Sequence, residues 1–356
     1  MADMKNMKNK TTKNNMINYG IVIVLFVIVQ ALSSTGNLSR LLMGLLVPLC
    51  VYTIASVSLN LVVGFSGELS LGHAGFMCVG AFSSALFSQV AADSIPQVPR
   101  FILAILVGAA VAALFGVIIG IPVLRLRGDY LAIVTLAFGE IIKNLINVMY
   151  VGVDQHGFHF SIKDTTSLGM DDTGVVIIKG AQGASGVSTY STFLAGAILV
   201  MVALVIVLNL VRSRTGRAIM AVRDNKIAAE SVGISVPEYR MIAFVVSAAL
   251  AGAAGALFGG NFSQLSATKF DFNTSILILV FVVLGGLGNM RGSVIAAALL
   301  TVLPELLRQF SDYRMLIYAI VLILVMIFTN NPQLKAFFGR VKDRFASKKE
   351  VAADAQ

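Results

Sequence analysis

Residues 64–76, GFSGELSLGHAGF, place two serines, a glutamate and a histidine between two long apolar runs. The GFSG string has the form of the nucleophile motif of intramembrane serine proteases, and GASG at 183–186 repeats that form. Such a protease needs a histidine base on a later span at the depth of the serine. His73 follows Ser66 closely, and the other two histidines, His156 and His159, fall in a polar stretch. An intramembrane serine protease is therefore a remote alternative for this chain.

The sequence contains no motif for the other kinds of enzyme considered. No His-Glu-x-x-His string is present, so a zinc protease is excluded. A phosphate-binding P-loop requires a Gly-Lys pair at the start of a helix, and no such pair occurs. The two cysteines, Cys50 and Cys78, lie in apolar runs and define neither a disulfide framework nor a metal site. We expect no metal, no cofactor and no enzymatic reaction in this chain.

The glycines of residues 64–80 favour a helix interruption instead. Irregular backbone at membrane depth persists only where protein or a water-filled cavity covers it, and transporters build their sites from such breaks. Polar side chains can satisfy the backbone groups that a broken helix leaves open. We name Glu68, Ser70 and His73 as candidates for lining a translocation path. A plain cytoplasmic turn with polar residues is the competing interpretation.

Glu140 and Lys143 lie near the middle of the apolar run 130–150. An isolated charge at the centre of a bilayer costs about 2.5–3.5 kcal/mol. At a spacing of three residues the two side chains share a helix face and can form an ion pair. The pair is either a structural element inside the helix bundle or a polar lining of the translocation path, and we add both residues to the path candidates.

A basic stretch, residues 213–240, separates two of the apolar runs. Asp224 can cap a short helix that begins at Asn225, and Gly233 can end it in a left-handed conformation. Pro237 then blocks continuation. One face of this helix is mildly apolar, with Ile227 and its neighbours at helical spacing. The stretch is either a solvated loop or a docking helix for a cytosolic partner.

Membrane-spanning helices must position these residues. The chain has 356 residues, of which 57% are hydrophobic and 13% are charged, whereas soluble domains carry about 25% charged residues. A crossing needs about 20 residues of helix. The sequence therefore predicts an all-α polytopic bundle of about 10 transmembrane helices (8–10), in which 275–309 either spans or forms a re-entrant hairpin. The apolar runs are 19–32, 41–63, 70–91, 101–121, 130–150, 190–211, 241–262, 275–289, 293–309 and 314–329.

Helix packing has its own signal in AALAGAAGALFGG, residues 248–260. Small residues recur there every four positions, in the rows Ala248-Gly252-Ala256-Gly260 and Ala251-Gly255-Gly259. Such rows allow transmembrane helices to approach closely. The glycine-rich stretch 283–292 is better suited to a tight turn between two interrupted spans.

The distribution of basic residues sets the orientation. With the N-terminus inside, most of the 27 Lys and Arg residues fall on cytoplasmic segments, as the positive-inside rule requires. Both termini are then cytoplasmic, and the net charge of +9 needs no nucleic-acid partner. A cleaved signal peptide over 1–33 is a disfavoured alternative. The predicted parts are a basic N-tail 1–18, a transmembrane domain 19–329 with an outer loop 151–189 and an inner loop 213–240, and a basic C-tail 330–356.

Five ordered stretches resemble the LivM-type permease subunit of bacterial branched-chain amino-acid ABC importers. They begin with GFSGELSLGHAGFMCVGAF (64–82) and LRGDYLAIVTLAFGEIIKNL (126–145), and cover nearly all of 40–328. The others are GRAIMAVRDNKIAAESVGI (216–234), FVVSAALAGAAGALFG (244–259) and SILILVFVVLGGLGNMRGSVIAAALLTVLPELLR (275–308).

The resemblance implies a multi-pass permease of the bacterial plasma membrane, without ATPase activity of its own. It implies pairing with a sister permease subunit, two cytosolic ATP-binding subunits that drive transport, and an extracytoplasmic substrate-binding protein. It also favours the docking-helix interpretation of the inner loop. The coupling residues it implies are Arg223, Asp224, Asn225, Ala228, Ala229, Glu230 and Gly233.

The implied substrate is a branched-chain, hydrophobic amino acid. Permeases of the same family serve urea, short amides and other amino acids, and these remain alternatives. A self-sufficient secondary transporter driven by an ion gradient is a further alternative from a different class.

Overall fold

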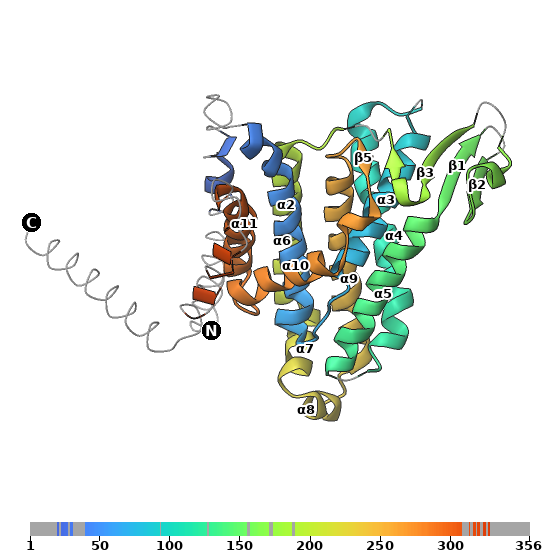
Figure 1. Ribbon diagram of the computed structural model, residues 1–356. Helices are drawn as coiled ribbons and strands as arrows, with labels where there is room; N and C mark the ends of the chain where they lie inside the picture. The colour runs from blue at the N-terminus through green and yellow to red at the C-terminus, as the bar shows by residue number, and fades with distance from the viewer. Residues whose placement is uncertain are drawn as a thin grey trace, which may run out of the picture. The chain divides into compact units, whose positions relative to one another are not determined.

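A computed structural model describes most of the chain (Figure 1). Residues up to Thr301 form one compact unit, and residues from Val302 onward belong to a second. The predicted N-tail 1–18 and C-tail 330–356 lie outside the described residues. The described positions are 20, 23–27, 29–30, 40–92, 94–126, 128–154, 157–170, 174–186, 189–307, 313, 316–317, 319–320, 323–324 and 327.

Helices dominate the described residues, and six segments are long and apolar enough to cross a membrane. The chain is therefore a mostly helical, multi-pass membrane protein, as predicted. The number of ten crossings and the position of the termini stay predictions. The six segments are Leu42–Ser66, Gln97–Val123, Asp129–Val148, Phe193–Arg212, Val236–Gly259 and Ala267–Gly285.

The long helices match the predicted apolar runs closely. Two shorter helices follow Arg212, and the helices before and after the turn at Gly286 have 14 and 17 residues. The helices are α2 (Arg40–Asn60), α3 (His73–Val90), α4 (Gln97–Val123), α5 (Asp129–Val148), α6 (Phe193–Arg212), α7 (Arg214–Asp224), α8 (Lys226–Ser231), α9 (Val236–Gly259), α10 (Phe272–Gly285) and α11 (Met290–Leu306).

The predicted outer loop is not irregular but forms most of an antiparallel sheet, which the sequence analysis missed. The strands pair in the order β2-β1-β3-β4-β5, and β5 follows α9 in the sequence. Ile177 and Ile178 point into the protein, whereas Phe158 and Phe160 are exposed. The strands are β1 (Tyr150–Asp154), β2 (Gly157–Ser161), β3 (Val175–Lys179), β4 (Ala184–Ser185) and β5 (Gln264–Leu265).

Glycines bring α3, α4 and α9 into direct backbone contact, which confirms the predicted packing role of 248–260. A Cβ added to Gly252 would lie 2.3 Å from the Cβ of Ala112. One added to Gly80 would lie 2.2 Å from the carbonyl oxygen of Gly252. Because any larger residue would push the helices apart, this contact fixes the centre of the bundle.

The sheet and the short helices α7 and α8 lie at opposite ends of the first unit (Figure 1). The helix α5 starts beside α8, where Asp129 and Lys226 line one cleft, and it ends directly before β1. Its 20 residues span about 30 Å, which is the thickness of a hydrocarbon core. The helix α6 returns over the same length and joins α7.

Candidate functional site

The first candidate region is the non-helical connection between α2 and α3, which fits both the predicted helix interruption and the competing interpretation as a plain turn. A π-helical turn, η1 (Leu61–Ser66), extends α2, and Gly67 ends it in a left-handed conformation with φ 73°. Residues 67–72 are then non-helical until α3 begins at His73. The loop packs on α5, where Leu71 N donates to Thr135 Oγ1 at 3.0 Å. Thr135 lies about 9 Å along α5 from its start, so the loop packs beside the second turn of that helix and not at its end.

His73 is buried at the start of α3 and joins three segments. Its Nε2 lies 2.8 Å from Ser58 Oγ on α2 and 3.4 Å from Ser247 Oγ on α9. Both hydroxyls donate to backbone carbonyls, Ser58 to Ala55 and Ser247 to Ser58, so Nε2 carries the proton. The lone pair of Nδ1 then has no partner among the described residues. These contacts do not link His73 to Ser66, which removes the support for a protease.

Ser70 completes this buried polar group. Its hydroxyl is buried without a hydrogen-bond partner in the described part of the chain. Two unsatisfied polar atoms in one interruption are unusual, because leaving such a group unpaired costs about 1–3 kcal/mol. The break is therefore polar enough to accept water or a ligand group once it opens.

Glu68 lies in a different setting, at the wall of a cleft beside α8. Its carboxylate pairs with Arg240 of α9 at 2.5 Å. Burial raises the pKa of the Glu68 carboxyl above its ordinary value, and the nearby Arg240 and Lys226 oppose that rise. The cleft has a volume of about 640 Å³ and contains charges of both signs. Its lining residues are Gly67, Glu68, Leu69, Gly128, Asp129, Lys226, Ile227, Glu230 and Arg240.

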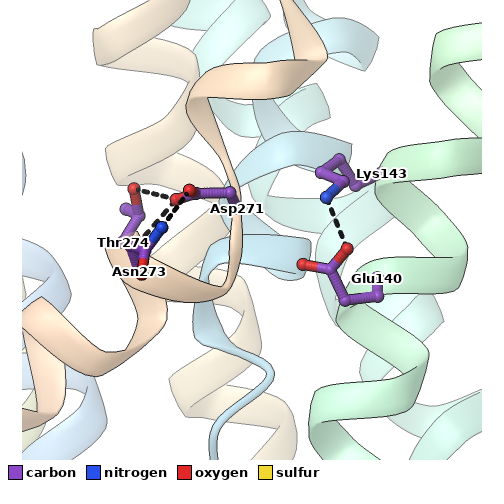
Figure 2. A network of polar contacts seen from close by, with 5 residues as sticks. All are labelled: Glu140, Lys143, Asp271, Asn273 and Thr274. Carbon is purple, nitrogen blue, oxygen red and sulfur yellow. Dashed lines mark hydrogen bonds and ion pairs between the residues drawn. The ribbon is translucent and has the colours of Figure 1, made fainter.

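Glu140 and Lys143 form an ion pair on α5, as predicted (Figure 2). The Lys143 ammonium points toward the start of α10, where it attracts the Asp271 carboxylate electrostatically. Asp271 caps α10 by accepting from Thr274 N at 2.9 Å and from Asn273 Nδ2 at 2.8 Å. Sequence reasoning missed Asp271, because its proximity to Lys143 depends on how α10 packs.

The inner loop 213–240 contains two helices, α7 and α8, in place of the single short helix expected. Asn225, not Asp224, caps α8, because the Asn225 side chain accepts from Ala228 N at 3.1 Å. Asp224 is the last residue of α7. The predicted left-handed ending is confirmed, since Gly233 has φ 83°.

The end of α8 is a complete Schellman motif. Gly233 N donates to Glu230 O, and Ile234 N donates to Ala229 O, both at 3.0 Å. Ala229 is buried against Val222 and Val236, so α8 is anchored from one side. The opposite side is open, with Ile227 at 80% exposure. Ala228 and Glu230 are exposed as well.

The Arg223 side chain extends toward η1, unlike the exposed side chains of Ala228 and Glu230, two of the predicted coupling residues on α8. Its Nη1 donates to the carbonyl oxygen of Gly64 in η1 at 2.9 Å. Its Nε and Nη2 both donate to Asp224 Oδ1. The contact with η1 joins residues far apart in the sequence, and no local pattern could have indicated it.

A second interruption lies between α10 and α11 and packs against the first. The predicted tight turn is confirmed: Asn289 N donates to Gly286 O at 3.0 Å, and Gly286 and Gly288 have φ values of 92° and 76°. Gly288 N donates to Asn60 Oδ1 at 2.9 Å. Asn60 Nδ2 donates to Ser293 Oγ at 2.8 Å. Sequence reasoning missed Asn60 and Ser293, although an asparagine inside the apolar run 41–63 was a usable signal.

The predicted path residues thus fall into three places. Glu68 lies in the cleft, Ser70 and His73 lie inside the break, and Glu140 and Lys143 lie on α5 opposite α10. The break and the α5 pair are neighbours, since a Cβ on Gly75 of α3 would lie 2.6 Å from Gly139 Cα. None of the described residues forms a cluster suited to a metal ion.

Candidate membrane-spanning helices, buried polar groups beside the helix interruptions and short helices exposed at one end of the bundle together fit a transport permease. A model of the family described as "Branched-chain amino acid transport system / permease component" matches residues 41–328, and the chain belongs to this family. The resemblance stated from the sequence is thereby confirmed.

The relatives fit this assignment. The high-affinity branched-chain amino acid transport system permease proteins LivM of Salmonella typhimurium and Escherichia coli are each 35% identical over 315 residues, which cover 82% of this chain and 71% of the relative. A nucleoside ABC transporter permease protein, NupC of Lactococcus lactis, is 25% identical over 233 residues, covering 64% of this chain and 71% of that protein. No solved structure matches the chain significantly.

Proposed function

We propose that the chain is the permease subunit of an ABC importer that moves branched-chain amino acids across the bacterial inner membrane. The family assignment and the names of the LivM relatives support this substrate class. The proposed complex contains a sister permease subunit, two cytosolic ATP-binding subunits and an extracytoplasmic binding protein. The permease has both termini in the cytoplasm and performs no covalent chemistry.

The observation on which this proposal depends is the geometry of α8. The helix is capped at both ends and anchored on its buried side, yet it presents Ile227 and Glu230 outward. It is too short to be stable alone in water, so its exposed face is maintained by the scaffold. That arrangement fits a helix that enters a cleft of an ATPase and transmits its closure. The proposed contact residues are Asn225, Ala228, Glu230 and the Gly233 ending, with Asp224 and the buried Ala229 as supports.

The proposed translocation path runs past the interrupted helices. An amino acid carries one carboxylate and one ammonium, and Glu140, Lys143 and Asp271 supply charges of both signs at the α5–α10 boundary. The 14-residue helix α10 begins there, and in transporters the ends of discontinuous helices often form the substrate site. His73 and Ser70, in and beside the loop between α2 and α3, offer further polar atoms without hydrogen-bond partners among the described residues. Glu68 lies at the inner exit beside the cleft.

Transport then requires a shift between two packings of the bundle, biased by ATP binding to the partners. The substrate remains open to alternatives within the family, including urea, short amides, other amino acids and, given the NupC relative, nucleosides. Competition experiments separate these possibilities. Uptake of labelled leucine by the complete importer should be displaced by isoleucine and valine, and displacement by urea or a nucleoside alone would contradict the proposed substrate.

The composition of the complex is testable by affinity purification of the tagged full chain from its native membrane, followed by mass spectrometry. We expect a second permease of similar size and an ATP-binding subunit in a 1:1:2 ratio. A chain that purifies alone and retains ion-driven uptake would support the secondary-transporter alternative instead.

A further inference from the structure

We infer that Arg223 is an internal tie, which couples α7 to both helix interruptions and acts inside the permease rather than on the ATPase. The inference rests on the proposed function, because it concerns how a displacement of α7 and α8 would reach the translocation path. The argument begins with the atoms around the Arg223 side chain.

The guanidinium of Arg223 meets the open end of a helix. A helix leaves its last carbonyls without intrahelical partners, and this end carries partial negative charge. The Gly64 carbonyl of η1 is such a group, and Arg223 Nη1 donates to it at 2.9 Å. The cation therefore sits where the helix end attracts it.

The orientation of the guanidinium is fixed from its other side. Nε and Nη2 donate to the same Asp224 oxygen at 3.0 Å and 2.8 Å. A planar group held by these two bonds directs Nη1 toward η1. Lysine cannot reproduce this, because its single ammonium has no rigid fork.

The aliphatic part of Arg223 occupies space that only a glycine leaves open. A Cβ on Gly67 would lie 2.6 Å from Arg223 Cγ, and the φ of 73° at Gly67 disfavours other residues independently. The side chain therefore contacts both the last turn of η1 and the first residue of the loop that leads to α3.

The second interruption reaches the same point. A Cβ on Gly64 would lie 2.3 Å from Gly288 N, and one on Gly288 would lie 3.9 Å from Arg223 Nη1. The α10–α11 turn, η1 and α7 therefore meet within the reach of one side chain. Because packed elements move as units, a displacement of α7 is transmitted to both interruptions through this contact.

The test uses the complete importer, reconstituted with its partner subunits and binding protein, carrying Arg223→Ala or Arg223→Lys. Arg217→Ala is the matched control, because Arg217 lies on the same helix and its Nη1 donates to the carbonyl of Arg212, the last residue of α6, at 3.0 Å. For Arg223→Ala we expect normal assembly with the ATPase, ATP hydrolysis retained, and transport per ATP reduced about tenfold. Arg223→Lys should give a smaller loss, and Arg217→Ala none.

A second readout separates a tie from a merely structural residue. Spin labels are placed on α8 at Ile227→Cys and on the turn at Leu287→Cys, which are 80% and 58% exposed in the chain. In the parent complex both labels should respond to ATP. With Arg223→Ala, the α8 label should still respond, whereas the response at position 287 should be lost.

Three results overturn the inference: unchanged transport per ATP in Arg223→Ala, a persistent ATP response at position 287, or loss of ATPase binding in Arg223→Ala, which would place the residue at the partner interface. Absence of any ATP response at position 227 in the parent complex would overturn the proposed function together with the inference. The two failures are therefore distinguishable.

Discussion

Asn60 on α2 donates from Nδ2 to Ser293 Oγ on α11 at 2.8 Å, and both side chains are fully buried. The same carboxamide accepts from Gly288 N. One side chain thus satisfies a hydroxyl of α11 and an amide of the turn before it. In a layer without water, this contact holds the second interruption against the end of α2.

Replacing Asn60 with leucine should destabilise the protein, because the half-buried Gly288 N loses its partner and the buried Ser293 hydroxyl loses one of its two partners. Each unsatisfied group costs about 1–3 kcal/mol. The measurement is the thermal unfolding midpoint of the purified chain in detergent. Thr301→Ala is the control, since the Thr301 hydroxyl donates to the carbonyl of Ala297 within its own helix. Equal midpoints for Asn60→Leu and Thr301→Ala would contradict this role.

Gly252→Ala should also destabilise the bundle. The added methyl group would meet the Ala112 side chain and the Gly108 carbonyl, so α4 and α9 must separate. Overpacking of this kind typically costs about 1–3 kcal/mol. Gly44→Ala, where an added Cβ meets nothing within 4 Å, should leave the unfolding midpoint unchanged or slightly raised. The account of the α3–α4–α9 contact would be refuted by a neutral Gly252→Ala.

Changes at the ends of α8 should reduce coupling while leaving the membrane bundle intact. Asn225→Ala removes the cap of α8, at a cost of about 1 kcal/mol. Gly233→Pro is more severe, because proline fixes φ near −65° and Gly233 requires 83°. We expect the Gly233→Pro permease to insert normally, while the assembled importer hydrolyses ATP on its partner subunits without uptake. Ser231→Ala, which loses one hydroxyl bond within α8, is the mild control. Normal transport by Gly233→Pro would count against α8 as the coupling helix.

The Glu140–Lys143 pair allows a test that separates structure from transport. Lys143→Met alone leaves the Glu140 carboxylate unpaired at membrane depth, where an isolated charge costs about 2.5–3.5 kcal/mol, whereas Glu140→Gln leaves Lys143 with the nearby Asp271. The double variant removes both charges and should recover most of the stability. If the pair lines the path, uptake by the double variant stays low although the protein is stable. Recovery of both stability and uptake would reduce the pair to a structural role.

Local patterns predicted the helical parts of this protein well. The glycines of 64–76 indicated the break, the small-residue rows indicated the α3–α4–α9 packing, and Gly233 indicated the end of α8. Each of these features depends on a few neighbouring residues, which the sequence displays directly.

Features that depend on distant partners were not predicted. The strand β5 pairs with β4 although the helices α6 to α9 lie between them in the sequence. Because no local pattern shows this pairing, the polar composition of 151–189 indicated a loop. The resemblance implied that Arg223 is a coupling residue, and no local pattern indicated that its Nη1 contacts the carbonyl oxygen of Gly64. Asn225 caps α8 because α7 extends through Asp224. The sequence alone does not distinguish between these two adjacent residues as the cap.

The central claim is that this chain is a passive permease whose energy comes from ATPase partners through α7 and α8. Accumulation of labelled leucine in proteoliposomes tests it most directly, with the chain reconstituted alone or with its sister permease, ATPase subunits and binding protein. The account predicts uphill uptake only in the complete complex with ATP. Uphill accumulation by the chain alone, under an ion gradient and without ATP, would contradict it.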